Sequence, residues 1–159
     1  MDARLNVLAS PTATKVVKHL VATNQVLASS SLPTATQELV KLRASQINGC
    51  SGCVDMHYKE AVAAGASPER LNMVAAWREA TVFTEAERAA LELAEEGTRI
   101  ADAAGGVSDD VWANAAKHYD DEQLVVLVIT IALINTFNRM NVMTRQPGGD
   151  YQPGMLAHH

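Results

Sequence analysis

Residues 122–143 read EQLVVLVITIALINTFNRMNVM, and the conformation of this apolar stretch decides the fold class. Its many β-branched side chains would also suit a buried strand. Its length, and the capping box that Asp120 and Gln123 form at its start, instead predict a helix. A helix that is apolar on every side is expected to be buried on every side. We therefore expect this helix at the centre of the domain or in a subunit interface.

The remainder of the chain reads as consecutive helices separated by short breaks. Three helix starts are marked by the capping boxes Thr34-x-x-Gln37 and Thr84-x-x-Glu87 and by the sequence Ser67-Pro68-Glu69. We expect helices over residues 14–27, 34–48, 50–65, 67–77 and 84–104, and a short one around Trp112. Aromatic residues make up only 4% of the chain, which favours packed helices over a sandwich or barrel. These features predict one all-α domain over residues 1–159, with a core at about 10–145 and an irregular tail at 146–159.

Charge and hydropathy argue against two classes of partner. The net charge is -5 and the chain has no cluster of Lys and Arg, so we expect no nucleic-acid binding. The apolar run from Leu124 to Ile134 is shorter than the roughly 20 residues that a helix needs to span a bilayer, so we expect no membrane insertion. The first residues lead into no apolar segment typical of a secretory signal, and we expect a cytoplasmic protein.

The segment Cys50-Ser51-Gly52-Cys53-Val54-Asp55-Met56-His57 concentrates the reactive groups of the chain. It contains both of the cysteines among the 159 residues. In a reducing compartment a Cys-x-x-Cys pair is more often catalytic or metal-binding than a structural disulfide. Because the pair stands where a helix is expected to begin, unpaired backbone N–H groups would favour the thiolate form. Cys50 is one helical turn before Cys53, close enough to form a disulfide within the motif.

His57 and Glu38 are the candidate proton-transfer groups beside this pair. His57 follows Cys53 by four residues, so on one helix face the two are about 6 Å apart. Glu38 is on the preceding predicted helix, and Asn48-Gly49 is typical of a helix stop. If the two helices form an antiparallel hairpin, Glu38 and His57 meet at about the same distance from its corner. A carboxylate there would orient the imidazole and support it as a base.

The same residues allow a different interpretation as a metal site. Cysteine, histidine and glutamate are all zinc ligands, but structural zinc sites more often contain a second Cys or His pair, which is absent here. We therefore expect no bound metal, with a zinc-binding module kept as an alternative. We also expect no cofactor, because no glycine-rich phosphate loop follows a strand.

Three polar residues, Asn135, Asn138 and Arg139, share one face of the apolar helix. They either mark the polar end of that helix, or one of them faces the site or crosses a subunit interface.

The whole pattern resembles a known family. Glu38, eleven further residues, Cys50-x-x-Cys53 and His57 resemble the core motif of the AhpD-like alkylhydroperoxidases of the carboxymuconolactone decarboxylase superfamily. The resemblance extends over about residues 10–145, including residues 42–50, 77–79 and 83–91 and the Asn135 to Arg139 segment. It implies an all-helical fold, a homo-oligomer, commonly a trimer or hexamer, and a thiol-dependent peroxidase that uses an unidentified dithiol reductant.

The resemblance also assigns a role to each residue of the motif. Cys53 resembles the cysteine that attacks the peroxide and becomes a sulfenic acid. Cys50 resembles the partner that donates a proton and then closes the disulfide, and Glu38 and His57 resemble the proton relay. Gly52 departs from the family pattern, in which a histidine precedes the second cysteine. Two alternatives therefore remain: a thiol–disulfide oxidoreductase, or a non-enzymatic redox sensor, either of them without peroxidase turnover.

Overall fold

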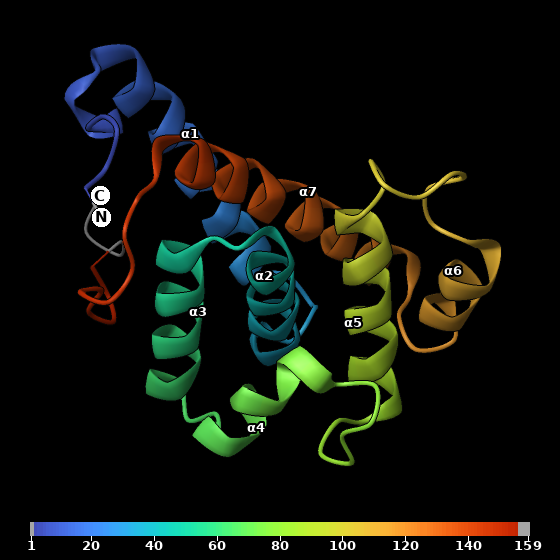
Figure 1. The fold of residues 1–159 in the computed structure, drawn as a ribbon. Helices are drawn as coiled ribbons and strands as arrows, with labels where there is room; N and C mark the ends of the chain where they lie inside the picture. Colours follow the sequence, from blue (N-terminus) through green and yellow to red (C-terminus); the bar gives the residue numbers. More distant parts are fainter. Residues whose placement is uncertain (1, 156–159) are drawn as a thin grey trace.

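The part of the chain that the structure describes folds into helices. The structure, a computed structural model, describes residues 2–155, and over these residues it has seven α-helices, two short 3-10 helices and no strand (Figure 1). In chain order they are η1 (Val7–Ala9), α1 (Pro11–Ala28), α2 (Thr34–Asn48), α3 (Ser51–Ala63), α4 (Pro68–Asn72), η2 (Met73–Ala76), α5 (Glu85–Thr98), α6 (Asp109–Ala116) and α7 (Asp121–Thr144). The all-α prediction is confirmed. Residues 156–159 of the predicted tail lie outside the described residues.

Helices α2 and α7 form the centre of the molecule. Figure 1 shows α2, α3 and α5 side by side, with α7 running across their upper ends. Helix α2 packs against α3, α5 and α7, and α7 also packs against α1, α3, α5 and α6. The side chains between these helices are almost fully enclosed, among them Val40, Leu42, Leu91 and Leu127. The prediction of a central apolar helix is confirmed.

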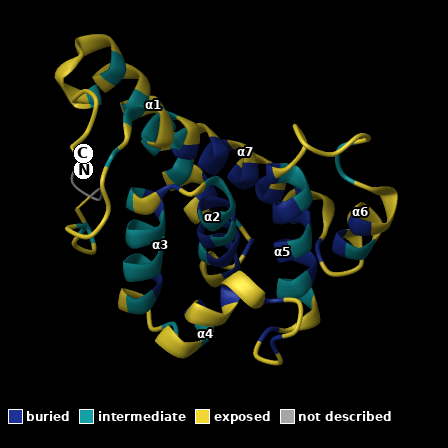
Figure 2. Ribbon diagram, in the orientation of Figure 1, coloured by how far each residue is buried: buried dark blue, intermediate teal, exposed yellow. Residues whose placement is uncertain are grey.

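One face of α7 is nevertheless open to solvent in the single chain. Leu127 is 0% exposed, whereas Val125 and Val128 are 54% and 43% exposed. Figure 2 shows buried and exposed residues alternating along α7. The expectation that this helix is buried on every side is therefore wrong for one chain. The physical reason is that the five helices that contact α7 all pack on its inward face, which leaves the opposite face uncovered in one chain.

By length and composition alone, α7 is long and apolar enough to cross a bilayer, so the expectation that its apolar run is too short for this is wrong. The core helix of a globular protein passes the same test, and α7 here packs against five other helices. Its inward face holds polar side chains, including Thr130 and Asn138, at 1% and 0% exposure. These contacts and buried polar side chains are those of a helix that packs in the protein core.

The helix starts follow their local signals with one exception. The capping boxes of α5 at Thr84 and of α7 at Asp120 are both present, and Ser67 caps α4. The predicted box at Thr34-x-x-Gln37 is wrong, because Pro33 is the N-cap of α2 and no side chain caps this helix. Gln37 is instead buried, and its amide donates hydrogen bonds to the backbone oxygens of residues 27 and 32. It therefore fixes the connection between α1 and α2.

Helix α5 ends at Thr98, six residues before the predicted end at residue 104. Thr98 is buried, but residues 99–105 are all exposed, so continuing the helix would cover no further apolar surface. Gly105 and Gly106 follow with φ of 99° and 68°, which a helix cannot accommodate.

Candidate active site

The two cysteines lie at the corner between α2 and α3. Gly49 ends α2 with φ of 66°, and Cys50 is the N-cap of α3. Because Gly49 takes the left-handed conformation readily, the chain reverses within two residues and α3 returns beside α2. Cys50 and Cys53 are joined by a disulfide, with their Cα atoms 5.3 Å apart. The expected position of the Cys-x-x-Cys pair, at the start of a helix, is confirmed.

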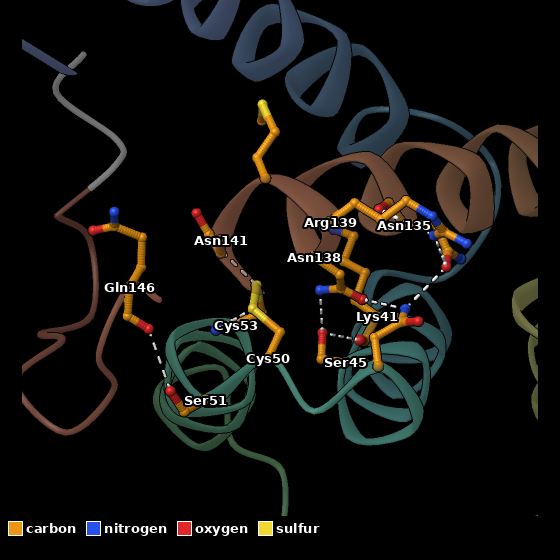
Figure 3. The surroundings of a disulfide bond; sticks show 12 residues. Lys41, Ser45, Cys50, Ser51, Cys53, Asn135, Asn138, Arg139, Asn141 and Gln146 are labelled. Carbon is orange, nitrogen blue, oxygen red and sulfur yellow. Dashed lines mark hydrogen bonds between the residues drawn. A yellow bond between two sulfur atoms is a disulfide. The ribbon is translucent and has the colours of Figure 1, made fainter. Parts of the chain in front are cut away.

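The two sulfur atoms have different hydrogen-bond partners. The Sγ atom of Cys50 accepts a hydrogen bond from the backbone N–H of Cys53, at 3.4 Å, as an N-cap side chain does. The Sγ atom of Cys53 accepts one from the side-chain amide of Asn141 on α7, at 3.3 Å (Figure 3). The two cysteines are only 1% and 2% exposed, so few other groups reach these sulfur atoms.

Glu38 and His57 meet as the helix hairpin predicts. The Oε2 atom of Glu38 lies 2.8 Å from Nδ1 of His57, and its Oε1 atom accepts a hydrogen bond from Nζ of Lys41 at 3.0 Å. The side chains of Glu38 and His57 are 14% and 12% exposed, and that of Lys41 is 5% exposed. The predicted contact between Glu38 and His57 is confirmed, while the catalytic roles of the four motif residues stay predictions.

The surroundings of Glu38 keep its carboxylate charged. Burial by itself would raise its pKa, but the hydrogen bond and the charge of His57, together with those of Lys41, outweigh burial and lower the pKa to about 2. Glu38 is therefore an anion throughout the physiological pH range. Its hydrogen bond occupies Nδ1 of His57 and leaves Nε2 as the ring nitrogen available for proton transfer.

A large, mainly apolar cavity of about 740 Å³ adjoins the disulfide. Cys53, His57 and Lys41 all contribute to its wall, so a bound molecule can contact all three. Most of the remaining wall is apolar, and the apolar side chains that α1 and α7 contribute are Val17, Val21, Leu133, Ile134, Phe137 and Met140. A cavity of this size and character suits an apolar organic molecule better than a small polar one.

The chain after α7 forms a strap along the exposed side of α3, made of residues 146–155. The carboxylate of Asp55 accepts hydrogen bonds from the backbone N–H groups of Gly149 and Tyr151, at 2.7 and 3.1 Å. Lys59 donates to the backbone oxygens of the same two residues, at 2.8 and 2.9 Å, and forms an ion pair with Asp55. Glu60 accepts from the backbone N–H of residue 154 at 2.8 Å. Three charged side chains of α3 therefore hold the strap in place.

The strap gives Gly52 a structural role. A Cβ atom at residue 52 would lie 3.3 Å from the backbone oxygen of Pro147, tighter than most such contacts. A Cβ atom at Gly148 would overlap the backbone oxygen of Ser51. The backbones of the strap and of the first turn of α3 thus approach each other closely because both positions are glycine. The strap occupies the space in front of residue 52, where the family pattern has a histidine.

Asn135 and Asn138 do not mark a polar, solvent-facing end of α7, and they face α2 instead of the cysteine pair. That one of the three polar residues crosses a subunit interface stays a prediction for Arg139, which is exposed. Both asparagines are buried, and their Oδ1 atoms each accept a hydrogen bond from Asn48 at 2.9 Å. The amide of Asn138 also donates to Oγ of Ser45 at 3.1 Å (Figure 3). Arg139 donates to Oδ1 of Asn135 at 2.7 Å. These side chains form a polar seam that fixes α7 on α2 and thereby places Asn141 at the disulfide.

The sequence alone did not identify Asn141 or the strap as parts of the site. The available signal for Asn141 was weak: it is one of several polar residues in the second half of α7, and nothing in the spacing singles it out. Over residues 2–155, no group of three or more His, Cys, Asp and Glu side chains is placed to hold a metal ion.

An all-helical fold with a Cys-x-x-Cys pair at a helix start and a Glu–His pair beside it is the arrangement expected for the family that the sequence resembles. The model of the carboxymuconolactone decarboxylase family matches residues 14–96. This chain belongs to that family, and the expected membership is confirmed.

Two similar proteins support the assignment. The uncharacterized protein YdfG of Bacillus subtilis (strain 168) is 41% identical over 113 residues, which cover 71% of this chain and 76% of YdfG. A crystal structure from Agrobacterium tumefaciens shares 40% identity and a TM-score of 0.85, over 94% of this chain and all of the other. That protein is described as one of unknown function and as a candidate antioxidant defence protein, AhpD.

A more distant structure shows that the fold serves other reactions. The debrominase Bmp8, solved with 2,3,4-tribromopyrrole, has a TM-score of 0.77 and 17% identity, over 89% of this chain and 73% of Bmp8. At this identity the likeness concerns the fold alone. Family membership and the cysteine pair together point to a function related to antioxidant and peroxidase proteins.

Proposed function

We propose that the protein is a thiol-dependent peroxidase that reduces alkyl hydroperoxides with its Cys50–Cys53 pair. One observation carries the proposal: Cys53 and His57 face the same apolar cavity, while Glu38 holds His57 by its Nδ1 atom. This arrangement combines a thiol that can be oxidised reversibly, a base that can take its proton, and space for an apolar substrate.

The reaction proceeds in three steps: oxidation of Cys53, closure of the disulfide, and its reduction by a dithiol. His57 takes the proton of the Cys53 thiol, the thiolate attacks the peroxide, the O–O bond breaks, and the alkoxide leaves as an alcohol with the proton from His57. Cys53 is now a sulfenic acid. The Cys50 thiol attacks its sulfur, releasing water and closing the disulfide. A dithiol reductant then restores both thiols and is itself oxidised to a disulfide.

The cavity supports an alkyl hydroperoxide over hydrogen peroxide as the substrate. Its wall is mostly apolar, and its volume of about 740 Å³ lies within the range of sites for small organic molecules. An alkyl group in this cavity would gain burial energy that hydrogen peroxide cannot gain. That difference in binding favours the larger substrate.

The proposal extends to the cellular compartment and the oligomeric state of the protein. We propose a cytoplasmic enzyme, because reducing conditions there return the disulfide to thiols. We also propose a homo-oligomer, since AhpD-like proteins are commonly oligomeric. The exposed apolar side chains of α7, Val125, Val128 and Ile129, support a contact with a second copy of the chain.

The test is a steady-state assay of hydroperoxide consumption with dithiothreitol as the reductant. We expect turnover of cumene hydroperoxide by the unmodified protein and none in Cys50→Ser or Cys53→Ser. Treating Cys50→Ser with one equivalent of hydroperoxide should trap a sulfenic acid at Cys53, which dimedone labels. Full turnover by Cys53→Ser would exclude Cys53 as the peroxide-reactive thiol.

One observation favours a second candidate, a thiol–disulfide oxidoreductase without peroxidase turnover. Residue 52 is glycine, and the strap fills the place of the family's histidine, so one link of the family's proton relay is absent. This candidate predicts that the protein catalyses reduction of a disulfide substrate by dithiothreitol at the same rate with and without hydroperoxide. A reversible disulfide with neither activity would instead indicate a redox sensor.

A further inference from the structure

The side-chain amide of Asn141 points at the sulfur of Cys53 from the last turn of α7 (Figure 3). We propose that Asn141 is a catalytic residue: its Nδ2–H group donates a hydrogen bond to Cys53 Sγ and stabilises the thiolate of Cys53. The inference rests on the proposed function, in which Cys53 acts as a thiolate once when it attacks the peroxide and again when the disulfide is reduced.

The chemistry of sulfur fixes the direction of this hydrogen bond. A disulfide sulfur and a thiolate have lone pairs and no proton, so they only accept hydrogen bonds. The amide nitrogen is therefore the group that faces Cys53, at 3.3 Å, while the amide oxygen would repel a thiolate. Cys53 is 2% exposed, so water contributes little to stabilising its charge. A hydrogen bond to a charged group in such a place lowers a thiol pKa by about one unit.

The backbone holds Asn141 in place for this role. Arg145 ends α7 with φ of 55°, and the chain then turns back so that the N–H of Gln146 donates to the backbone oxygen of Asn141 at 2.9 Å. One to two turns earlier in α7, the polar seam at Asn135 and Asn138 fixes the helix on α2. The amide donor is thus aimed at the sulfur by a rigid element, which suits a group that must stabilise charge without rearranging.

The helix termini make a donor necessary at this point. Cys53 is in the first turn of α3, whose free N–H groups attract negative charge, but it also lies at the C-terminal end of α7, where free carbonyl groups repel it. The backbone N–H of Cys53 donates its hydrogen bond to Cys50 Sγ and therefore does not stabilise the sulfur of Cys53. The Asn141 amide therefore supplies the donor that the Cys53 thiolate lacks.

A donor at Cys53 also determines which sulfur the reductant attacks. A disulfide breaks faster when the departing thiol has the lower pKa. The reductant thiolate therefore bonds to Cys50 Sγ, the S–S bond breaks, and Cys53 leaves with the electron pair as a thiolate held by Asn141. The second reductant thiol then attacks the mixed disulfide and releases Cys50. Cys50 lines a second cavity of about 330 Å³ with Ser51 and Arg145. This cavity shares Asn141, Gln146 and Pro147 with the substrate cavity.

The experiment measures the ionisation of Cys53 directly. In the Cys50→Ser background Cys53 is the remaining thiol, and its thiolate is titrated by ultraviolet absorbance, which requires no reagent to reach the sulfur. We expect Asn141→Ala to raise the midpoint by about one pH unit and Asn141→Asp, which has the same shape but brings a carboxylate, to raise it further. Asn141→Ser keeps a hydroxyl donor and should fall between the parent and Asn141→Ala. Asn114→Ala, the same change on the distant α6, should leave the midpoint unchanged.

The outcomes separate this inference from the proposed function. An unchanged or lower midpoint in folded Asn141→Ala and Asn141→Asp overturns the role of Asn141, whatever the peroxidase activity. If Asn141→Ala does not fold, Asn141→Leu, which is close to asparagine in shape but carries neither a hydrogen-bond donor nor a charge, decides the matter by the same criterion. A raised midpoint in a protein that consumes no hydroperoxide supports the thiolate donor while the peroxidase proposal fails.

Discussion

Glu38 Oε2 and His57 Nδ1 lie 2.8 Å apart, although 19 residues separate them in the sequence. The contact exists because Gly49 reverses the chain between α2 and α3 and brings two buried helix faces together. Lys41 binds the other oxygen of Glu38, so the carboxylate is fixed at both ends. His57 is therefore held in one ring orientation at the wall of the cavity.

The first prediction concerns this pair. Glu38→Gln removes the charge that orients and supports His57 as a base, so kcat/KM for cumene hydroperoxide should fall by about a hundredfold while the protein remains folded. Circular dichroism checks the fold, and the dithiothreitol-coupled assay measures the rate. Glu69→Gln, the same change at an exposed carboxylate of α4, is the matched control. Equal rates for the two variants would contradict a relay through Glu38.

The second prediction concerns stability and pH. The pKa of Glu38 is lowered from 4.5 to about 2, so its carboxylate stabilises the fold above the unfolded pKa, and this contribution is lost as the pH falls towards 2. The full contribution is about 3 kcal/mol. We expect the difference in unfolding free energy between the parent and Glu38→Gln to shrink by about 2 kcal/mol between pH 7 and 3, measured by urea unfolding. If the difference in unfolding free energy between the two proteins stays constant over this pH range, Glu38 has an ordinary pKa.

The third prediction concerns the size of the substrate. Val21 of α1 lines the cavity, and Val21→Trp would fill part of it. We expect kcat/KM to fall about tenfold for cumene hydroperoxide and to stay nearly constant for hydrogen peroxide, because only the larger molecule needs the lost volume. An equal loss for both substrates would mean that the alkyl group binds elsewhere.

The fourth prediction concerns the strap. Gly148→Ala would place a methyl group on the backbone oxygen of Ser51, so the strap should detach from α3. Limited proteolysis should then cut within residues 146–155 faster than in the parent protein. Gly105→Ala makes the same change in a distant loop with no neighbouring atom, and should leave cleavage of the strap unaffected. Gly52→His should act in the same direction as Gly148→Ala.

The fifth prediction concerns assembly. Val128 is 43% exposed in the single chain, so Val128→Lys should cost one chain little stability. If a second copy covers this face of α7, the buried lysine would weaken the contact, and light scattering should report a smaller particle than for the parent protein. Ala113→Lys on the exposed side of α6 serves as the control. An unchanged mass for Val128→Lys would place any subunit contact elsewhere.

Features that depend on neighbouring residues were predictable from the sequence. The caps at Thr84 and Asp120, the stop at Gly49 and the cysteine pair at the start of α3 each involve residues within one or two helical turns. The Glu38–His57 contact could also be predicted from the sequence, because one short helix hairpin fixes the distance between the two residues.

Features that join distant parts of the chain were not predictable in this way. Asn141 and Cys53 are 88 residues apart, and Asp55 and Gly149 are 94 apart. Their contacts depend on how α7 lies across the bundle, which periodicity does not determine. The polar seam shows the same limit: the spacing placed Asn135 and Asn138 on one face, but only the packing shows that α2 covers that face.

The cavity has a practical consequence for anyone who labels this protein. Its wall includes Asn6 and Val7 near one end of the described chain and Tyr151 and Met155 near the other. A fluorophore attached within residues 6–7 or 151–155 would therefore stand in the wall of the cavity that also contains Cys53. The exposed loop at residues 99–105, on the far side of α5, is the better position for a reporter group. Kinetic comparisons should accordingly be made on protein that carries no label in the cavity wall.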